Sequence, residues 1–270
     1  YIKPQLGGKQ VSLVTAQDVQ KLYRRLKENG RIREHPRFGS ALSDTTINRL
    51  HAIFHQAMED ALHAHIIAKN PTVGATVPKA SHAPKRVLTD KELDTFLDAV
   101  REDKIWGDFF YVELTTGLRR GELLALRWED LDVQNRTLSI NKSVARQDGK
   151  LVISTPKTPN SIRTVLLPAD TIKLLVEEHE RHPANPYLFP SPRTGETWDP
   201  DGFRRLHDRI VKEIGAEHVR FHDMRHTFAT LSLKSGVDVR TLSETLGHFS
   251  AGFTLSTYVH STPGMKQSAA

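Results

Sequence analysis

Six side chains in the last two-thirds of the sequence carry groups that could together cut a phosphodiester through a covalent tyrosyl phosphate. Two guanidiniums can bind the non-bridging oxygens of a phosphate, where negative charge grows in the transition state. A phenol can attack phosphorus, while lysine and imidazole side chains can move protons. These residue types indicate strand breakage and rejoining on DNA without a metal ion. In chain order they are Arg119, Lys157, His222, Arg225, His248 and Tyr258.

Taken singly, each residue also has an ordinary structural interpretation. Arg119 could pair with Glu122, three residues later, and Arg225 with Asp223. Lysine on a hairpin loop is usually solvated, and a tyrosine at helical spacing is usually part of a core. The order and spacing of the whole set are therefore what carry the functional hypothesis.

The spacing of His222 and His226 raises a metal site as a competing hypothesis. Four residues apart, the two imidazoles can share one face of a helix. A zinc hydrolase motif of this kind would have Glu rather than Asp223 after the first histidine, and it would need a third ligand. We therefore expect no metal, and we expect His226 to face away from Arg225 as a core or capping residue.

Charge divides the chain into two parts of about the size of ordinary domains. Residues 1–86 hold 14 Lys and Arg against 6 Asp and Glu, whereas residues 87–270 hold 24 against 26. A basic segment with two prolines, residues 78–86, is typical of a linker. We expect a DNA-binding domain over residues 1–84, a second domain over 85–270, and a basic surface that contacts phosphates. The expected contacts are Lys21, Arg24, Arg25, Lys27, Arg49, Lys79, Lys85 and Arg86.

Periodicity predicts a helical first domain and a mixed second one. Helices are expected over residues 14–29, capped by Thr15 with Asp18, and 44–68, ended by Asn70 and a proline, with a buried stripe that includes Ile53. The second domain should hold helices at 89–100 and 109–126, the latter broken at Thr116 and Gly117, then strands at 137–146, 151–155 and 162–167. Further helices are expected at 169–181, 200–214, 224–235, 238–246 and 252–260.

The sequence contains no cysteine, which excludes disulfides and thiolate metal sites and suits a reducing cytoplasm. No apolar run approaches the roughly 18 residues of a membrane span, and no signal-like segment opens the chain. We therefore expect a cytoplasmic protein with no membrane contact. Because the first residue is Tyr1, we also expect a segment upstream to be missing.

The local strings around these residues resemble the tyrosine recombinases, or phage integrase family, and most closely the integrases of conjugative transposons. The resemblance covers nearly the whole chain, and its motifs are specific as a set. They are residues 116–123 (TGLRRGEL) with 128–132 (WEDLD), 155–158 (TPKT) with 162–165 (IRTV), and 221–230 (FHDMRHTFAT) followed by 246–248 (LGH) and Tyr258.

The resemblance implies a role for each residue of the set. Arg119 and Arg225 would bind the scissile phosphate. Lys157, on the loop between the second and third strands, would protonate the departing 5′ oxygen. Tyr258 would form the 3′-phosphotyrosyl bond. The proton of Tyr258 would pass to His222, His248 would bind the phosphate or orient the site, and Glu122 would support an arginine or a histidine.

The implied fold is mainly α with a small antiparallel β-sheet, arranged as a two-domain, C-shaped DNA clamp of a helical core-binding domain and a catalytic domain. Integrases of this type begin with an arm-binding domain, and this chain would start near the end of the first core-binding helix.

The implied partners are double-stranded DNA core sites, three further copies in a tetramer that passes through a Holliday junction, and an accessory directionality protein. Phosphodiester energy is conserved, so no cofactor is expected. Two alternatives remain open at this point: a type IB topoisomerase, and a catalytically silent DNA-binding protein on the same fold.

Overall fold

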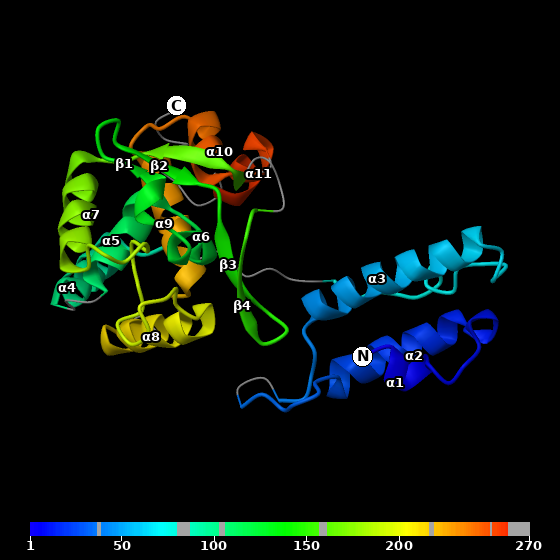
Figure 1. The fold of residues 1–270 in the computed structure, drawn as a ribbon. Helices are drawn as coiled ribbons and strands as arrows, with labels where there is room; N and C mark the ends of the chain where they lie inside the picture. Colours follow the sequence, from blue (N-terminus) through cyan, green and yellow to red (C-terminus); the bar gives the residue numbers. More distant parts are fainter. Residues whose placement is uncertain are drawn as a thin grey trace. The chain divides into compact units, whose positions relative to one another are not determined.

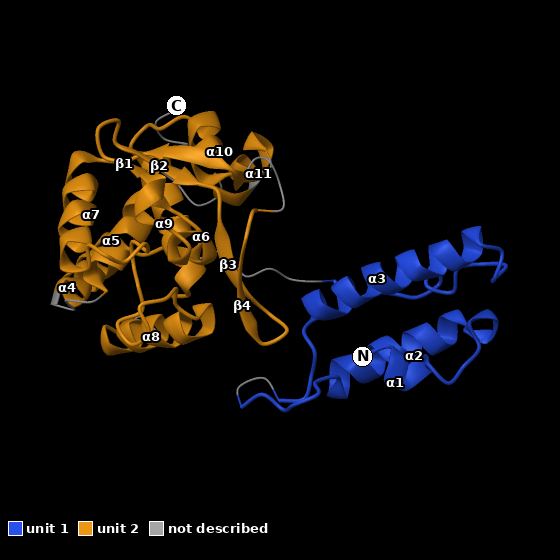
Figure 2. Ribbon diagram, in the orientation of Figure 1, with its two compact units in different colours: residues 1–84 blue, residues 85–270 orange. Residues whose placement is uncertain are grey.

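The computed structural model of the 270-residue chain divides into two compact units, Tyr1–Pro84 and Lys85–Ala270 (Figure 2). The structure describes residues 1–36, 39–79, 87–102, 106–156, 161–215, 219–248 and 250–258. Each unit has a hydrophobic core of its own. The architecture is mainly helical, as predicted, and the strands form two small antiparallel sheets where one was expected.

Unit 1 is built on two helices, α2 (Ala16–Asn29) and α3 (Asp44–His63), preceded by the short helices α1 (Lys3–Leu6) and η1 (Val11–Leu13) (Figure 1). The predicted capping box at the start of α2 is present, because Thr15 and Asp18 exchange hydrogen bonds with each other's backbone amides. Tyr23 and Leu26 of α2 pack against residues of α3 in a single core. The unit thus buries one face of each helix and leaves the opposite faces to solvent.

Helix α3 ends at His63, five residues before the predicted end. His65 has a positive φ of 57°, which an α-helix cannot accommodate, and the amide of Ile66 donates back to the carbonyl of Ala61 (2.9 Å). The predicted buried stripe is also wrong in part. Ile53 is 65% exposed, because the buried positions Ile47, Phe54 and Met58 define a face from which Ile53 is turned away.

The helices of unit 2 surround a core rich in phenylalanine (Figure 1). Helix α4 starts as predicted, with Thr89 and Glu92 bonded reciprocally. Helix α9 begins at Phe221, three residues earlier than predicted, so His222 lies in its first turn. The helices are α4 (Asp90–Glu102), α5 (Gly107–Thr116), α6 (Arg120–Leu124), η2 (Trp128–Asp130), α7 (Ala169–Arg181), α8 (Pro200–Glu213), α9 (Phe221–Lys234), α10 (Val239–Leu246) and α11 (Ala251–Tyr258).

The strands form a three-stranded antiparallel sheet in the order β1-β2-β5 and a separate hairpin, β3-β4. The run predicted as one strand over residues 137–146 is therefore two strands in two sheets. The hairpin turn is the predicted one: Asp148 and Gly149 both have positive φ, as a type I′ turn requires. The strands are β1 (Leu131–Asp132), β2 (Thr137–Ile140), β3 (Ser143–Gln147), β4 (Lys150–Ser154) and β5 (Arg163–Leu166).

The break between α5 and α6 falls at Gly117, as predicted. Gly117 adopts the left-handed conformation (φ 60°), and a Cβ there would lie 2.3 Å from Cδ1 of Phe228 on α9. Only glycine lets the chain turn here against α9. Arg119 follows the turn as the N-cap residue of α6.

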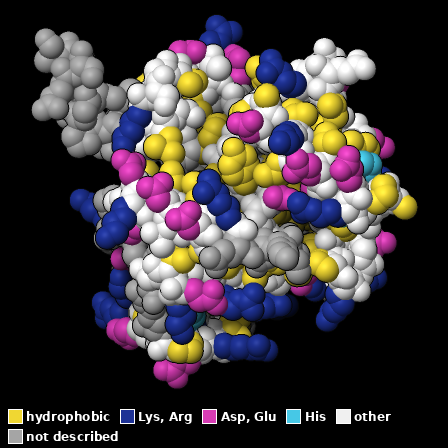
Figure 3. Space-filling model, turned by 90° about the vertical axis from the view of Figure 1, so that its left-hand side faces the viewer, with side chains coloured by type: hydrophobic (Ala, Val, Ile, Leu, Met, Phe, Trp, Pro, Cys, Tyr) yellow, Lys and Arg dark blue, Asp and Glu magenta, His cyan; other side chains and the backbone are white. Residues whose placement is uncertain are grey.

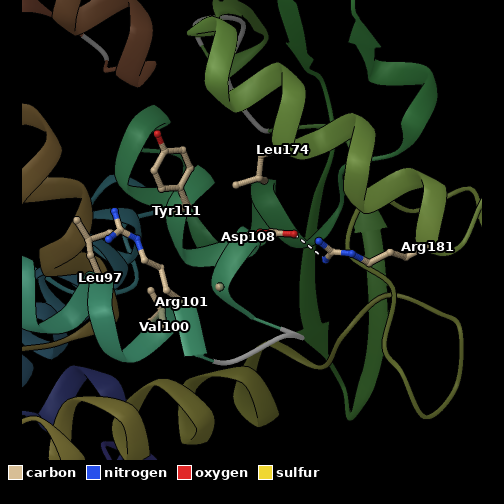
Figure 4. Close-up of a pocket in the computed structure, with 8 residues that line it drawn as sticks. Leu97, Val100, Arg101, Asp108, Tyr111, Leu174 and Arg181 are labelled. Atoms are coloured by element: carbon tan, nitrogen blue, oxygen red, sulfur yellow. Dashed lines mark hydrogen bonds and ion pairs between the residues drawn. The ribbon is translucent and has the colours of Figure 1, made fainter.

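A pocket of about 520 Å³ lies between α4, α5 and α7 and is bordered by the Asp108–Arg181 ion pair (2.7 Å), but it contains none of the predicted site residues (Figure 4). On the face drawn in Figure 3, Lys and Arg side chains alternate with Asp and Glu. Among the described residues, none of the helices combines the length and apolar character needed to cross a bilayer.

Candidate active site

Arg119 lies at the N-cap position of α6, where contacts with the first turn of that helix orient its side chain. Its backbone amide donates to Oε2 of Glu122 (3.0 Å), and its Nη1 donates to Oε1 of the same carboxylate (2.7 Å). Nη2 donates to the carbonyl of Gly247 (3.0 Å), at the end of α10. The Arg119 side chain is still 38% exposed, so its fork is fixed on one side and open to a ligand on the other.

Glu122 is buried and is shared between two arginines. Arg163 on β5 donates from Nη2 to Oε2 of Glu122 (2.9 Å), and from Nε to the carbonyl of Thr245 (2.6 Å). Burial acts to raise the pKa of Glu122, but the hydrogen bond and charge of Arg163, with those of Arg119, outweigh it and hold the pKa below its ordinary value. Glu122 therefore stays ionised and fixes both arginines, which is the supporting role expected of it.

Arg225 lies beneath Arg119 and is almost completely buried. Its Nη1 donates to the carbonyl of Gly117 (2.8 Å) and its Nη2 to the carbonyl of Leu246 (2.6 Å). Burial, followed by the nearby charge of Arg119, lowers the pKa of Arg225 to about 10, so the guanidinium remains charged at neutral pH. The ordinary structural interpretation of Arg225, an ion pair with Asp223, does not hold. Asp223 instead pairs with Arg220 (3.0 Å).

Tyr258 ends α11 and is 2% exposed, within a cluster that includes Leu242, Leu246 and Leu233. Burial raises the pKa of the phenol, whereas the charges of Arg225 and Arg119 act against that rise by stabilising the phenolate. The site therefore combines a shielded phenol with two fixed positive charges.

His248 and His226 both pack against the Tyr258 ring. His248 lies parallel to it, with 5.9 Å between ring centroids, and its Nδ1 is 2.7 Å from Oγ1 of Thr254. The sequence predicts that His226 faces away from Arg225 as a core or capping residue. His226 is buried, and its Nδ1 lies 3.0 Å from the Tyr258 hydroxyl oxygen, a contact that the sequence did not predict.

The structure thus brings together Arg119, Glu122, Arg225, His248 and Tyr258 from four elements of unit 2. His222 is exposed one turn before His226, with 4.9 Å between the two ring centroids. Lys157 lies outside the described residues, as do Lys85 and Arg86 of the predicted DNA contacts. The other predicted contacts are exposed: Lys21, Arg24, Arg25, Lys27, Arg49 and Lys79.

Two residues of this site received no role from the sequence. His226 shares a helical face with Ala229 and Leu233, both buried, so its spacing indicated a buried face but not that Tyr258 would lie against it. Arg163 lies two residues before the buried Val165 along β5, so its side chain is on the same, inner face. Within the described ranges, no group of three or more His, Asp or Glu side chains is placed to hold a metal ion.

Comparison with known proteins shows the family of the chain. The model of the phage integrase family matches residues 86–265, and all of that range lies in unit 2. A XerC-like tyrosine recombinase of Caldanaerobacter subterraneus is 27% identical over the whole chain and 73% of its own length. The ICEBs1 integrase of Bacillus subtilis is 30% identical over 86% of the chain, which spans 66% of that relative, just under two thirds.

Solved structures extend the likeness to both units. The Tn1549 transposon integrase in complex with transposon right end DNA superimposes with a TM-score of 0.82 at 25% identity, covering 98% of this chain and 89% of that one. The lambda integrase tetramer bound to a Holliday junction shares the fold, with a TM-score of 0.67 at 16% identity over 95% of this chain and 68% of its own. This chain belongs to the phage integrase family, the tyrosine-type site-specific recombinases that break and rejoin DNA.

Proposed function

We propose that this protein integrates and excises a mobile genetic element by cutting and rejoining double-stranded DNA at core sites through Tyr258. The observation that carries the proposal is the convergence of Arg119, Arg225 and Tyr258 in one largely buried site of unit 2. Two guanidiniums beside a buried phenol stabilise its phenolate form, and the phenolate oxygen is the nucleophile that attacks phosphorus.

The two arginines divide the work of binding the scissile phosphate. Arg225 uses both amino groups on backbone carbonyls, so it is a rigid buried charge. Arg119 is anchored on one side by Glu122 and offers its remaining donors to the solvent side. Charge that develops on the non-bridging oxygens would meet donors already in place, with no reorganisation during the reaction.

The reaction then follows with atoms and protons in balance. The Tyr258 oxygen gives its proton to His222 and forms a bond to phosphorus at the 3′ side, while the bond from phosphorus to the 5′ oxygen breaks. Lys157 supplies the proton that the departing 5′ oxygen needs. A 5′ hydroxyl from a partner duplex reverses both transfers, so the energy of the phosphodiester is kept in the phosphotyrosyl bond.

Unit 1 supplies much of the sequence-independent grip on DNA in this proposal. Lys21, Arg24 and Arg25 follow one another at helical spacing on α2, opposite the buried residues Tyr23 and Leu26. Lys27 pairs with Asp44 at the start of α3. Exposed cations on one helix face can neutralise several phosphates without any base contact.

The proposal extends to four copies of the chain on two core sites, with strands exchanged in pairs through a Holliday junction, and to an accessory protein that sets direction. The support comes from relatives: the lambda integrase forms a tetramer on a Holliday junction, and the Tn1549 integrase binds transposon-end DNA. A cytoplasmic site of action, in a bacterial cell on element or phage DNA, follows from the same proposal.

A nicked suicide substrate tests the proposal directly. Such DNA loses a short 5′ fragment after cleavage, so the covalent intermediate accumulates and resists denaturant. We expect one adduct for each cleaved strand, and mass spectrometry of the tryptic peptide should place it on Tyr258. A wild-type protein that binds the element's core site and forms no adduct would contradict the proposal and favour a silent DNA-binding protein.

Supercoiled plasmid without a core site distinguishes the topoisomerase alternative. A recombinase needs a paired partner site, so it should relax such a plasmid slowly and only at high protein concentration. Efficient relaxation of this plasmid by a monomer would show that the protein is a topoisomerase that uses the same chemistry.

A further inference from the structure

Three arginines from three different elements converge on successive carbonyls at the end of α10. The carbonyls of Thr245, Leu246 and Gly247 each accept a hydrogen bond from one of them, at 2.6, 2.6 and 3.0 Å. In that order, the donors are Arg163 on β5, Arg225 on α9 and Arg119 at the start of α6. Carbonyls at the C-terminal end of a helix lack partners within it and carry partial negative charge, so they suit guanidiniums. The end of α10 is therefore a fixed point that all three side chains share.

Arg163 differs from the other two arginines because it turns its donors inward. Its side chain is only 6% exposed. Besides the bond to Thr245, its guanidinium donates to the carbonyl of Ser161 (3.1 Å) and to both carboxylate oxygens of Glu122 (3.3 and 2.9 Å). A guanidinium has five N–H donors, so these four bonds leave little to offer a phosphate. Arg163 can instead fix the groups to which it bonds.

We propose that Arg163 is a positioning residue for strand cleavage, which sets the direction in which Arg119 faces the scissile phosphate. Arg119 has two anchors, the Glu122 carboxylate (2.7 Å) and the Gly247 carbonyl (3.0 Å). Arg163 holds both anchors, because it bonds directly to Glu122 and also to Thr245, in the last turn of α10 before Gly247. The inference rests on the proposed function, in which Arg119 binds the phosphate.

The two oxygens of the Glu122 carboxylate are divided between the arginines. The Arg119 side chain bonds to Oε1, whereas Oε2 receives Nη2 of Arg163 and the backbone amide of Arg119. Without Arg163, both oxygens would be free to accept the Arg119 fork in a bidentate pair, an arrangement that guanidiniums and carboxylates often adopt. The donors that Arg119 offers to the solvent side would then turn towards Glu122 and away from the phosphate.

The backbone of Arg163 is held by the sheet. Arg163 is the first residue of β5 and pairs with the buried Ile140 of β2 in antiparallel register. Strand β5 also packs against α10. Side chains on strands hold a geometry more precisely than side chains on loops. The sheet is thus a rigid base from which one guanidinium reaches both α6 and α10.

The first experiment measures cleavage of the suicide substrate by Arg163→Lys at saturating DNA. Lysine keeps the positive charge that the buried Glu122 needs, so the variant should fold, but one ammonium cannot hold both Glu122 and the Thr245 carbonyl. We expect cleavage to slow by about 10²-fold, the effect of a small misplacement of a reacting group, while DNA affinity stays within about twofold of wild type. Arg181→Lys is the matched control, because Arg181 also pairs with two acidic side chains of unit 2, and it should cleave at the wild-type rate.

The second experiment places the same change in an Arg119→Ala background. If Arg163 acts through Arg119, adding Arg163→Lys should slow Arg119→Ala by no more than about twofold. A loss of about 10²-fold in both backgrounds would show that Arg163 only supports the fold, and it would overturn the proposal. Wild-type cleavage by Arg163→Lys would overturn it as well.

Urea unfolding checks that each variant is folded at the assay temperature. If Arg163→Lys is not, Arg163→Met combined with Glu122→Gln leaves no buried charge unpaired and takes its place in both backgrounds, with the same results expected. Absence of an adduct from the wild type would instead contradict the proposed function itself.

Discussion

Each unit contains a buried tyrosine hydrogen-bonded to a histidine, and the two pairs differ in their surroundings. In unit 1 the Tyr23 hydroxyl lies 2.7 Å from Nδ1 of His51, and burial alone raises the pKa of Tyr23 to about 12. In unit 2 the corresponding distance from Tyr258 to His226 is 3.0 Å, but Arg225 and Arg119 oppose the effect of burial. The hydrogen bond is common to both, so the fixed cations are what make one phenol a candidate nucleophile.

The arginines can act in this way because unit 2 holds its charges in place. Glu122 fixes Arg119 and Arg163, and backbone carbonyls fix Arg225. Unit 1 keeps its basic side chains on exposed helix faces, where water screens them. Exposed charge suits attraction of a polyanion at long range, and buried charge suits stabilisation of one transition state.

The largest expected effect comes from removing the hydroxyl of Tyr258, with removal of the Tyr23 hydroxyl as the comparison. Tyr258→Phe should form no covalent adduct, because no other group can make the phosphotyrosyl bond, while its affinity for core-site DNA stays within about twofold of wild type. Tyr23→Phe should still form the adduct, since its phenol has no cation beside it. Gel analysis of the suicide substrate measures both. An adduct from Tyr258→Phe would remove the contrast between the two pairs.

Lys157 is predicted to complete the chemistry in unit 2 as general acid. Lys157→Ala should slow cleavage of ordinary DNA by about 10²- to 10⁴-fold. A substrate with sulfur at the 5′ bridging position leaves as a thiolate without a proton, so it should restore most of the rate. Arg119→Ala should not be rescued in this way. If sulfur leaves the Lys157→Ala rate unchanged, the proton comes from another group.

Breaking the buried Arg163–Glu122 ion pair should lower folding stability much more than breaking an exposed arginine–glutamate pair. Arg163→Met leaves a buried carboxylate with one partner fewer and should destabilise the fold by about 3 to 5 kcal/mol at neutral pH. Arg240→Met breaks the exposed Arg240–Glu244 pair on α10 and should cost less than about 1 kcal/mol. Thermal or urea unfolding measures both, and equal losses would contradict the distinction.

Lowering the pH should reduce the difference in folding stability between the wild type and Arg163→Met. In the wild type the pKa of Glu122 is below its ordinary value, so the ion pair contributes fully above that value and is lost as pH falls through the lowered one. In Arg163→Met the carboxyl loses its strongest partner, so protonation relieves the buried charge. The loss of stability caused by Arg163→Met should therefore shrink as pH falls from 7 towards 4.

The smallest effects are expected from the exposed cations of unit 1. Replacing Lys21, Arg24 and Arg25 together with Gln should weaken DNA binding and reduce the slope of log affinity against log salt by about 0.9 for each phosphate that these side chains neutralise. Arg101→Gln, an exposed arginine beside the pocket of unit 2, is the control. An unchanged slope would show that α2 does not bind phosphates.

Local structure in both units follows from the amino-acid sequence alone. Thr15 with Asp18 and Thr89 with Glu92 start helices as predicted, and Asp148 with Gly149 makes the expected hairpin turn. These features join residues within a few positions, where backbone geometry alone decides which groups meet. The motif residues also indicated the chemistry, because only a few side chains can attack, bind or protonate a phosphodiester.

Which of these groups meet depends on the tertiary structure. His226 reaches Tyr258 across 32 positions, Arg163 reaches Glu122 across 41, and Arg225 reaches Gly117 across 108. Helical periodicity could place His226 on a buried face but could not say which helix would cover that face. That depends on how α5, α10 and α11 pack round α9, and packing is set by the whole core rather than by any segment.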